Sequence, residues 1–240
     1  MRMIVSDLDG TLLLRGEKKL HKTSVSALEK LICGNVVFCI ASGRSYSELK
    51  RIFGELSDKI FFVANDGALI MYKGKNIYDV PISAEKVRSF EDEENVVAHG
   101  RYISFVKSHS ERFVRGIKEQ YCGHILRTDS LEAVTEPIYK IALYGKTEKT
   151  VDLNRVYCGS NVCEYVECGI NKGVAVTELS RILKIAKSDI YAVGDGINDI
   201  EMFKAAEKSY VISSAPPRVK KNAKYIVNDF KAAAEILLEE

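Results

Sequence analysis

The chain begins with MRMIVSDLDGTLLL (residues 1–14), in which an apolar run leads into two aspartates, a glycine and a threonine. Such a run predicts a buried strand. Asp7 and Asp9 follow that strand one residue apart, and neighbouring carboxylates repel each other unless a cation compensates their charge. The stretch therefore predicts both the first strand of the core and a candidate metal site at its end.

Four more short runs rich in β-branched or aromatic residues resemble the first. The five predicted strands are residues 3–5, 36–40, 60–64, 190–193 and 210–212. Nearly continuous apolar runs are typical of parallel strands that are covered on both faces. Helical patterns lie between them, with Thr23 as the expected cap of one helix and Ser45–Glu48 as a capping box for the next. This alternation predicts an α/β fold with a doubly wound parallel sheet.

The alternation breaks in the middle of the chain. Strands are expected there at 96–98, 103–106, 138–144 and 162–166, with a helix near 111–121. Strands with a two-residue period and intervening helices predict a small α+β domain, inserted between the third and fourth core strands. Its length of about 85 residues is sufficient for an independent core. We therefore expect a core of residues 1–81 and 169–240 and an inserted domain of residues 82–168.

Composition and charge exclude several classes of protein. With 46% hydrophobic and 28% charged residues the chain is typical of globular proteins, and its net charge of +2 provides no field for nucleic acid or membrane. No apolar run reaches the roughly 18 residues of a membrane helix, and Asp7 and Asp9 interrupt the opening run, so no signal peptide is expected. The six cysteines contain no C-x-x-C pair. We expect reduced thiols in a cytoplasmic protein.

Polar residues follow the carboxyl ends of four predicted strands, where doubly wound sheets bind their ligands. They are Asp7, Asp9, Gly10 and Thr11; Ser42, Gly43 and Arg44; Asn65, Asp66 and Gly67; and Gly194, Asp195, Gly196, Asn198 and Asp199. All-oxygen ligation by carboxylates favours Mg²⁺ over soft metals. Small hydroxyls and glycine amides beside a metal suit phosphate.

Each signal has a plainer explanation when it stands alone. Asp9 with Gly10, and the segment 65–67, can be ordinary turns. Asn198 can cap a helix, and Lys172 can be a surface lysine. Their convergence on one edge of the sheet favours a common site.

These residues resemble the four motifs of the haloacid dehalogenase superfamily. The motifs are DLDGTLL at 7–13, IASGR at 40–44, NKG at 171–173 and GDGINDIEMF at 194–203. Their order, with the insertion between the second and third, is similar to that of the Cof-type phosphatases of subfamily IIB. The resemblance implies a Rossmann-like core with an inserted α+β cap that determines specificity. It also implies a Mg²⁺-dependent phosphatase of small phosphorylated metabolites, such as sugar phosphates or phosphoglycolate-like acids.

The resemblance assigns roles to the acidic residues. Asp7 is the expected nucleophile, which forms an aspartyl-phosphate, and Asp9 is the expected general acid and base. Asp7, Asp195 and the main-chain carbonyl of Asp9 would bind Mg²⁺, with Asp199 beside it or in its second shell. The chemistry agrees, because a carboxylate that attacks a phosphate dianion needs cations to offset the repulsion.

Five further residues form the expected phosphate-binding set. The resemblance implies that Ser42 and Lys172 hold the phosphoryl oxygens, with Ser42 standing where many relatives have threonine. Thr11, Gly43 and Asn198 join them as small hydroxyl, glycine and amide groups at the same edge. Arg44, by contrast, is expected to make structural ion pairs rather than to contact substrate.

Three alternatives remain open at this stage. A sugar phosphomutase of the same superfamily would share all four motifs. A non-enzymatic receiver would accept phosphate on Asp66, but would leave GDGIND and the inserted domain unexplained. A binding module with a dead site is disfavoured, because no motif acid is missing. The sequence does not choose between a monomer and a homodimer, or name the physiological substrate.

Overall fold

The computed structural model describes residues 1–14, 16–145 and 149–239. Its larger sheet has eight strands in the order β14-β13-β12-β1-β2-β3-β4-β5. These are β1 (Arg2–Ser6), β2 (Val36–Ala41), β3 (Phe61–Ala64), β4 (Leu69–Tyr72), β5 (Lys75–Asp79), β12 (Ile190–Gly194), β13 (Lys208–Ile212) and β14 (Tyr225–Val227). All pairs from β14 to β3 are parallel. The doubly wound α/β core and its five predicted strands are therefore present.

The sheet ends in an antiparallel hairpin that the sequence analysis did not predict. β4 pairs antiparallel with both β3 and β5. Lys73 and Gly74 connect β4 to β5, and both have positive φ, 49° and 74°. Two consecutive residues with positive φ are typical of the type I′ turn that matches the twist of a two-residue hairpin. The Lys-Gly pair is a weaker signal than Asn-Gly, so the hairpin was missed.

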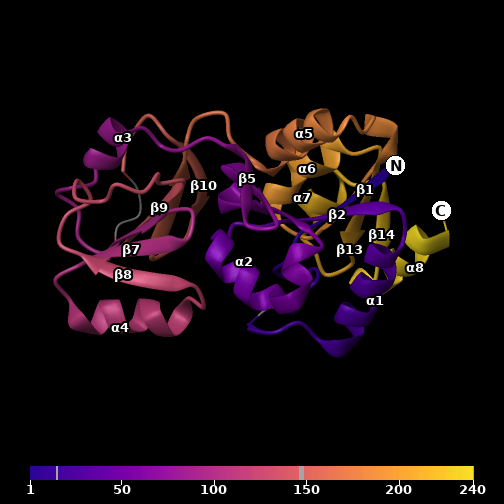
Figure 1. Ribbon diagram of the computed structural model, residues 1–240, viewed down its shortest axis with the longest axis horizontal. Helices are drawn as coiled ribbons and strands as arrows, with labels where there is room; N and C mark the ends of the chain where they lie inside the picture. Colours follow the sequence, from indigo (N-terminus) through magenta and orange to yellow (C-terminus); the bar gives the residue numbers. More distant parts are fainter. Residues whose placement is uncertain (15, 146–148, 240) are drawn as a thin grey trace.

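Helices cover both faces of the larger sheet (Figure 1). One face carries α1 (Lys22–Cys33), α2 (Tyr46–Phe53) and α8 (Phe230–Glu239), and the other carries α5 (Lys172–Leu183), α6 (Ile200–Ala205) and α7 (Pro217–Lys220). Successive side chains of β1 alternate between the two cores, since Ile4 joins the first and Met3 and Val5 the second. The sheet is thus buried on both sides, as its continuous apolar strands require.

Two helix starts test the predicted caps. The Ser45–Glu48 capping box is present at the start of α2. The prediction of Thr23 as a cap was wrong, because α1 begins at Lys22 and the ring of His21 accepts the backbone N–H of Thr23. Among the described residues, no helix is long and apolar enough to cross a membrane.

The second sheet has six strands in the order β10-β11-β9-β6-β7-β8. They are β6 (Val96–His99), β7 (Ile103–Lys107), β8 (His124–Thr128), β9 (Lys140–Tyr144), β10 (Asn154–Cys158) and β11 (Val162–Val166). α4 (Glu111–Gln120) packs on one face, and α3 (Ala84–Arg88) contributes Val87 to the core on the other. The four predicted strands and the helix are present. β8 and β10 are edge strands with exposed side chains, and they were missed.

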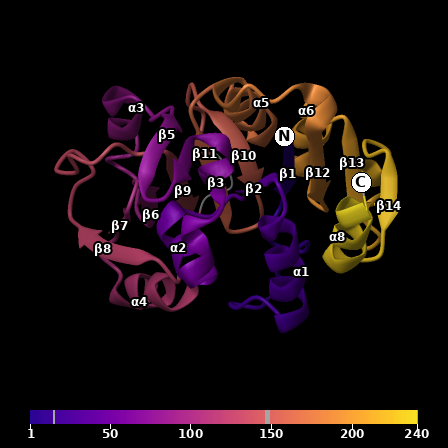
Figure 2. The same cartoon turned by 45° about the vertical axis from the view of Figure 1, so that its right-hand side comes forward.

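Figure 1 places the second sheet to one side of the first, next to α2, and Figure 2 shows α4 and β8 on that side after the turn. The chain passes to it between β5, which ends at Asp79, and β6, which begins at Val96. It returns between β11, which ends at Val166, and α5, which begins at Lys172. The predicted boundaries at 81/82 and 168/169 fall within these two connections.

The cysteines differ from the prediction at one pair. Cys158 and Cys163 form a disulfide, whereas Cys33, Cys39, Cys122 and Cys168 are free. The expectation that all thiols are reduced was therefore wrong for this pair. The two cysteines lie directly opposite each other at the turn between antiparallel β10 and β11. A spacing of five residues does not reveal this register, because it depends on where the hairpin turns.

Candidate active site

The four polar loops meet at the carboxyl edge of the larger sheet, as the sequence analysis predicted. They form one wall of a cavity of about 810 Å³, and the second sheet with its connections forms the other. The wall formed by the larger sheet and its loops contributes Asp7, Asp9, Ser42, Gly43, Arg44, Glu48, Asp66, Asp195, Gly196, Ile197, Asn198 and Pro216. The second part contributes Gln120, Tyr121, Lys140, Val156, Tyr157, Cys158 and Glu164. The cavity therefore lies between the two parts of the chain.

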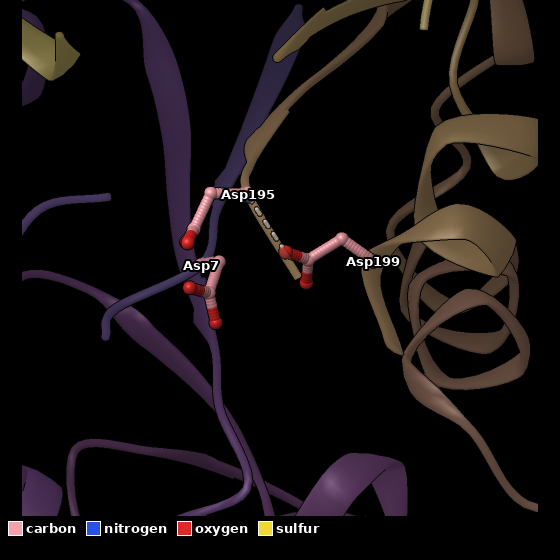
Figure 3. Close-up of side chains that lie close together, drawn as sticks. All are labelled: Asp7, Asp195 and Asp199. Atoms are coloured by element: carbon pink, nitrogen blue, oxygen red, sulfur yellow. Dashed lines mark hydrogen bonds between the residues drawn. The ribbon is translucent and has the colours of Figure 1, made fainter. Parts of the chain in front are cut away.

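Three buried carboxylates lie close together (Figure 3), and two of them, Asp7 and Asp195, line this cavity. Asp7 follows β1, Asp195 follows β12, and Asp199 lies in the 3-10 turn Ile197–Asp199. Each offers one oxygen within 4.8 Å of the others, which makes them a candidate metal site among the described residues. The donors are all carboxylate oxygens, and they fit Mg²⁺.

Asp199 differs from the other two acids because protein donors already occupy both of its oxygens. Oδ2 accepts the backbone N–H groups of Asp195 at 3.0 Å and Gly196 at 2.8 Å. Oδ1 accepts Lys172 Nζ at 2.7 Å. Asp199 therefore fixes the loop that presents Asp195. This geometry favours Asp7 and Asp195 as direct ligands, and leaves Asp199 beside them.

Gly10 allows the first loop to approach Asp195. Its φ is +96°, and a Cβ on it would lie 2.4 Å from Asp195 Oδ2. Both the positive φ and the close contact exclude a side chain at this position without rearrangement. The glycine of the opening motif thus brings the Asp7 loop against the Asp195 loop.

Lys172 supplies the buried positive charge of the site. Its Nζ donates to Asp7 Oδ1 at 2.6 Å and to Asp199 Oδ1 at 2.7 Å, and the residue is 1% exposed. Burial lowers the pKa of Lys172, but Asp199 and Asp7 outweigh burial and raise it above its ordinary value. Burial and the adjacent Asp199 raise the pKa of Asp7. A bound cation would favour the ionised form of Asp7, which nucleophilic attack requires.

The side chain of Asp9 lies outside the carboxylate cluster. It is 45% exposed and accepts two hydrogen bonds from Arg44, from Nε at 2.9 Å and from Nη2 at 2.7 Å. Arg44 also lies 3.7 Å from Glu48. Arg44 makes ion pairs, as expected, but its main partner is a predicted catalytic residue at the cavity. The idea that both carboxylates of the opening motif reach one ion is not supported for the Asp9 side chain.

The expected phosphate-binding residues divide into two groups. Ser42, Gly43 and Asn198 line the cavity. Thr11 and Lys172 do not: the Thr11 hydroxyl donates to Asp195 Oδ1 at 2.9 Å, and Lys172 Nζ donates to Asp7 Oδ1 at 2.6 Å. In this structure these two residues contact the carboxylates and do not line the large cavity.

Asp66 has no place in the carboxylate cluster. Its Oδ1 accepts Asn198 Nδ2 at 3.1 Å, and its Oδ2 lies 3.5 Å from Lys140 Nζ. The side chain is 6% exposed. Held in this way beside the phosphate-binding loops, Asp66 is a poor candidate for a phosphate-accepting aspartate.

Sequence reasoning missed Lys140, which joins the second sheet to the site. Its side chain, 4% exposed, reaches the carbonyl of Gly43, Glu164 Oε2 at 3.1 Å and Asp66 Oδ2. Burial lowers the pKa of Lys140, but Glu164 and Asp66 outweigh burial and raise it. One signal was available, since Lys140 is the only charged residue in the apolar run IYKIALY, and a lone charge in a buried strand needs a partner.

Comparison with known proteins places this geometry in a family. A family model described as haloacid dehalogenase-like hydrolase matches residues 4–234. The chain is 22% identical over 243 residues to the 5-amino-6-(5-phospho-D-ribitylamino)uracil phosphatase YbjI of Escherichia coli strain K12, covering 94% of this chain and 90% of that protein. It is 24% identical over 245 residues to an HMP-PP phosphatase of Klebsiella pneumoniae strain 342, covering 91% and 86%.

Solved structures share the whole fold. One described as the subclass IIB sugar phosphatase BT4131 superposes with a TM-score of 0.82 at 18% identity, covering 100% of this chain and 98% of that chain. A haloacid dehalogenase-like hydrolase from Bacteroides thetaiotaomicron gives a TM-score of 0.83 at 22% identity, with 99% and 98% covered. Both parts of the chain, and their arrangement, therefore recur in known folds.

Proposed function

The chain belongs to the haloacid dehalogenase-like hydrolases, and from this we propose that it is a phosphatase that hydrolyses small phosphorylated metabolites. One observation carries the proposal: the carboxylate of Asp7 lies at the cavity floor, within 4.8 Å of Asp195 and bonded to a buried lysine. Curated relatives that act on small phosphorylated compounds support the substrate class.

Asp7 would act as the nucleophile. One of its oxygens attacks phosphorus, the bond from phosphorus to the leaving oxygen breaks, and an aspartyl-phosphate forms. Water then attacks the same phosphorus, which releases phosphate and restores the Asp7 carboxylate. Covalent catalysis divides one difficult hydrolysis into two easier displacements. Lys172 offsets negative charge beside Asp7 throughout, because it is held in place by Asp199.

Asp7 and Asp195 would hold Mg²⁺ directly, with the Asp9 carbonyl as a further ligand and Asp199 next to them. When bound, Mg²⁺ supplies charge that reduces repulsion between the nucleophile and the phosphate. Thr11 orients Asp195 through its hydroxyl. Ser42, Gly43 and Asn198 line the space where the phosphoryl oxygens would lie.

Asp9 would give a proton to the leaving oxygen and later remove one from the attacking water. Its carboxylate is paired with Arg44 here, so the pair must separate before Asp9 can carry a proton. The side chain of Asp9 is partly exposed and faces the same cavity as Asp7, which allows such a rearrangement when substrate enters.

Residues 82–168 would act as a cap over the core of residues 1–81 and 169–240. Seven residues of this segment line the cavity opposite the catalytic loops, and they would exclude water and contact the leaving group. A cavity of about 810 Å³ between two parts of the chain favours a small substrate over a phosphorylated protein.

The proposal is tested by phosphate release from p-nitrophenyl phosphate, with Mg²⁺ and with chelator. We expect turnover that requires Mg²⁺, and none above background for Asp7→Asn, which keeps the shape of the side chain. Circular dichroism would check that Asp7→Asn is folded. Retained activity in this variant would exclude Asp7 as the nucleophile, and accumulation of a bisphosphate from a sugar phosphate would indicate a phosphomutase instead.

A further inference from the structure

We propose that the cavity selects phosphate monoesters whose leaving group carries no second negative charge, and that Glu164 determines this preference. The inference rests on the proposed phosphatase function and specifies its substrate class. It favours hydroxyl-rich or amine-bearing leaving groups over phosphoglycolate-like acids.

The first observation is the shortage of available positive charge. Among the lining residues that the structure describes, the lysines and arginines are Arg44 and Lys140. Arg44 is committed to Asp9 through two hydrogen bonds. Lys140 is committed to Glu164, Asp66 and the Gly43 carbonyl. Among these described residues, a carboxylate or a second phosphate on the leaving group would find a cation only by breaking one of these pairs.

The second observation is that the cavity wall is acidic. It includes Asp7, Asp9, Glu48, Asp66, Glu164 and Asp195, against the two paired cations. At the phosphoryl end, Lys172 and a bound metal would balance the acids. Lys172 bonds Asp7 and Asp199 and does not line this cavity, so its charge acts on these carboxylates. An anionic leaving group would therefore be repelled, because like charges brought together at a recognition site disfavour binding.

Glu164 is the acid placed to contact the leaving group. It lies on β11 opposite Ala142 of β9, in the second sheet, and lines the cavity, where Lys140 links it to the Gly43 carbonyl. Its Oε2 accepts Lys140 Nζ at 3.1 Å, and its side chain keeps 20% of its surface exposed. No described residue donates to Oε1, so this oxygen can accept a hydroxyl or an ammonium from a substrate. Glu48 is less suited, because Ser45 and Arg44 already surround its carboxylate.

Matched substrates test the inference. Glycerol 3-phosphate and 3-phosphoglycerate differ in a hydroxymethyl group against a carboxylate, and sorbitol 6-phosphate and 6-phosphogluconate differ in the same way. We expect kcat/KM for each neutral compound to exceed that of its acidic partner by about tenfold or more, the ratio that 1.4 kcal/mol produces. The difference should lie mainly in KM, because the charge acts on binding. It should shrink at high ionic strength.

Glu164→Gln should raise kcat/KM for the acidic member of each pair and reduce the ratio several-fold. Glu85→Gln is the matched control, since Glu85 is an exposed acid of α3 in the same segment and does not line the cavity. It should leave the ratio unchanged.

The outcomes separate the two proposals. Absence of hydrolysis with every compound, p-nitrophenyl phosphate included, would contradict the phosphatase function itself. Hydrolysis with equal efficiency for neutral and acidic partners in the unmodified protein would overturn the charge preference, and this measurement needs no variant. A preference that persists in a folded Glu164→Gln protein would overturn the assignment to Glu164.

Discussion

Replacing Lys140 with methionine should destabilise the protein, because Glu164 and Asp66 would lose the buried cation that pairs with them. Lys140 Nζ lies 3.1 Å from Glu164 and 3.5 Å from Asp66. With an effective dielectric constant of about 20, each attraction amounts to roughly 5 kcal/mol before desolvation is subtracted. Loss of one partner from a buried pair typically costs about 3–5 kcal/mol. Glu164 can regain some water, so we expect the free energy of unfolding to fall by about 3 kcal/mol, at the lower end of this range.

The assay is thermal unfolding followed by circular dichroism. For a chain of this size 1 kcal/mol corresponds to about 2–4 °C, so Lys140→Met should lower Tm by roughly 6–12 °C. Lys118→Met is the matched control, because Lys118 is exposed on α4, and its Tm should change by little. Adding Asp66→Asn to Lys140→Met should recover part of the loss, since the amide no longer leaves a buried charge. A Tm for Lys140→Met within about 2 °C of the unmodified protein would refute the argument.

Three further results are expected. Gly10→Ala should lower the free energy of unfolding by about 1–2 kcal/mol, measured by urea unfolding, because alanine disfavours the positive φ. It should also weaken Mg²⁺ binding, measured by calorimetric titration, because the added Cβ displaces Asp195. Gly116→Ala is the control and should not destabilise the protein, because a Cβ there meets open space. Burial, and then Lys140, lower the pKa of His99 well below its ordinary value, so the folded protein keeps it neutral while the unfolded chain takes up a proton below about pH 6.5. The free energy of unfolding should therefore fall as pH drops from 7.5 to 5.5, by up to about 1.4 kcal/mol per pH unit from this group. Urea unfolding of His99→Gln should show a smaller fall over the same pH range. Finally, iodoacetamide added to the denatured, unreduced protein should label the four free cysteines, and labelling of all six would contradict the Cys158–Cys163 disulfide.

The sequence predicted the elements whose signal is local. Buried parallel strands such as β1 and β2 have continuous apolar runs, so their positions and order could be read directly. The loops that follow them carry the motif acids, and their meeting at one edge follows from the topology alone. β8 and β10 lie at sheet edges with exposed side chains, so they lacked such a signal.

Contacts between distant segments were beyond sequence reasoning. Lys140 and the Gly43 carbonyl are separated by 97 residues, and nothing in either neighbourhood specifies the other. The pairing of Asp9 with Arg44 was likewise missed, although both residues were singled out, because motif spacing does not reveal which way a partly exposed side chain points. In each case the missing information was the placement of the second sheet or the rotamer of a long side chain.

The two connections between the sheets have an evolutionary consequence. Both crossings lie outside the paired strands, so the inserted segment can be lengthened, shortened or remodelled without breaking a ladder in the core. If residues 82–168 act as the proposed cap, mutations there would alter substrate choice while leaving the catalytic loops unchanged. Proteins with this fold can therefore diverge in the inserted segment during evolution while the core and its loops are inherited unchanged.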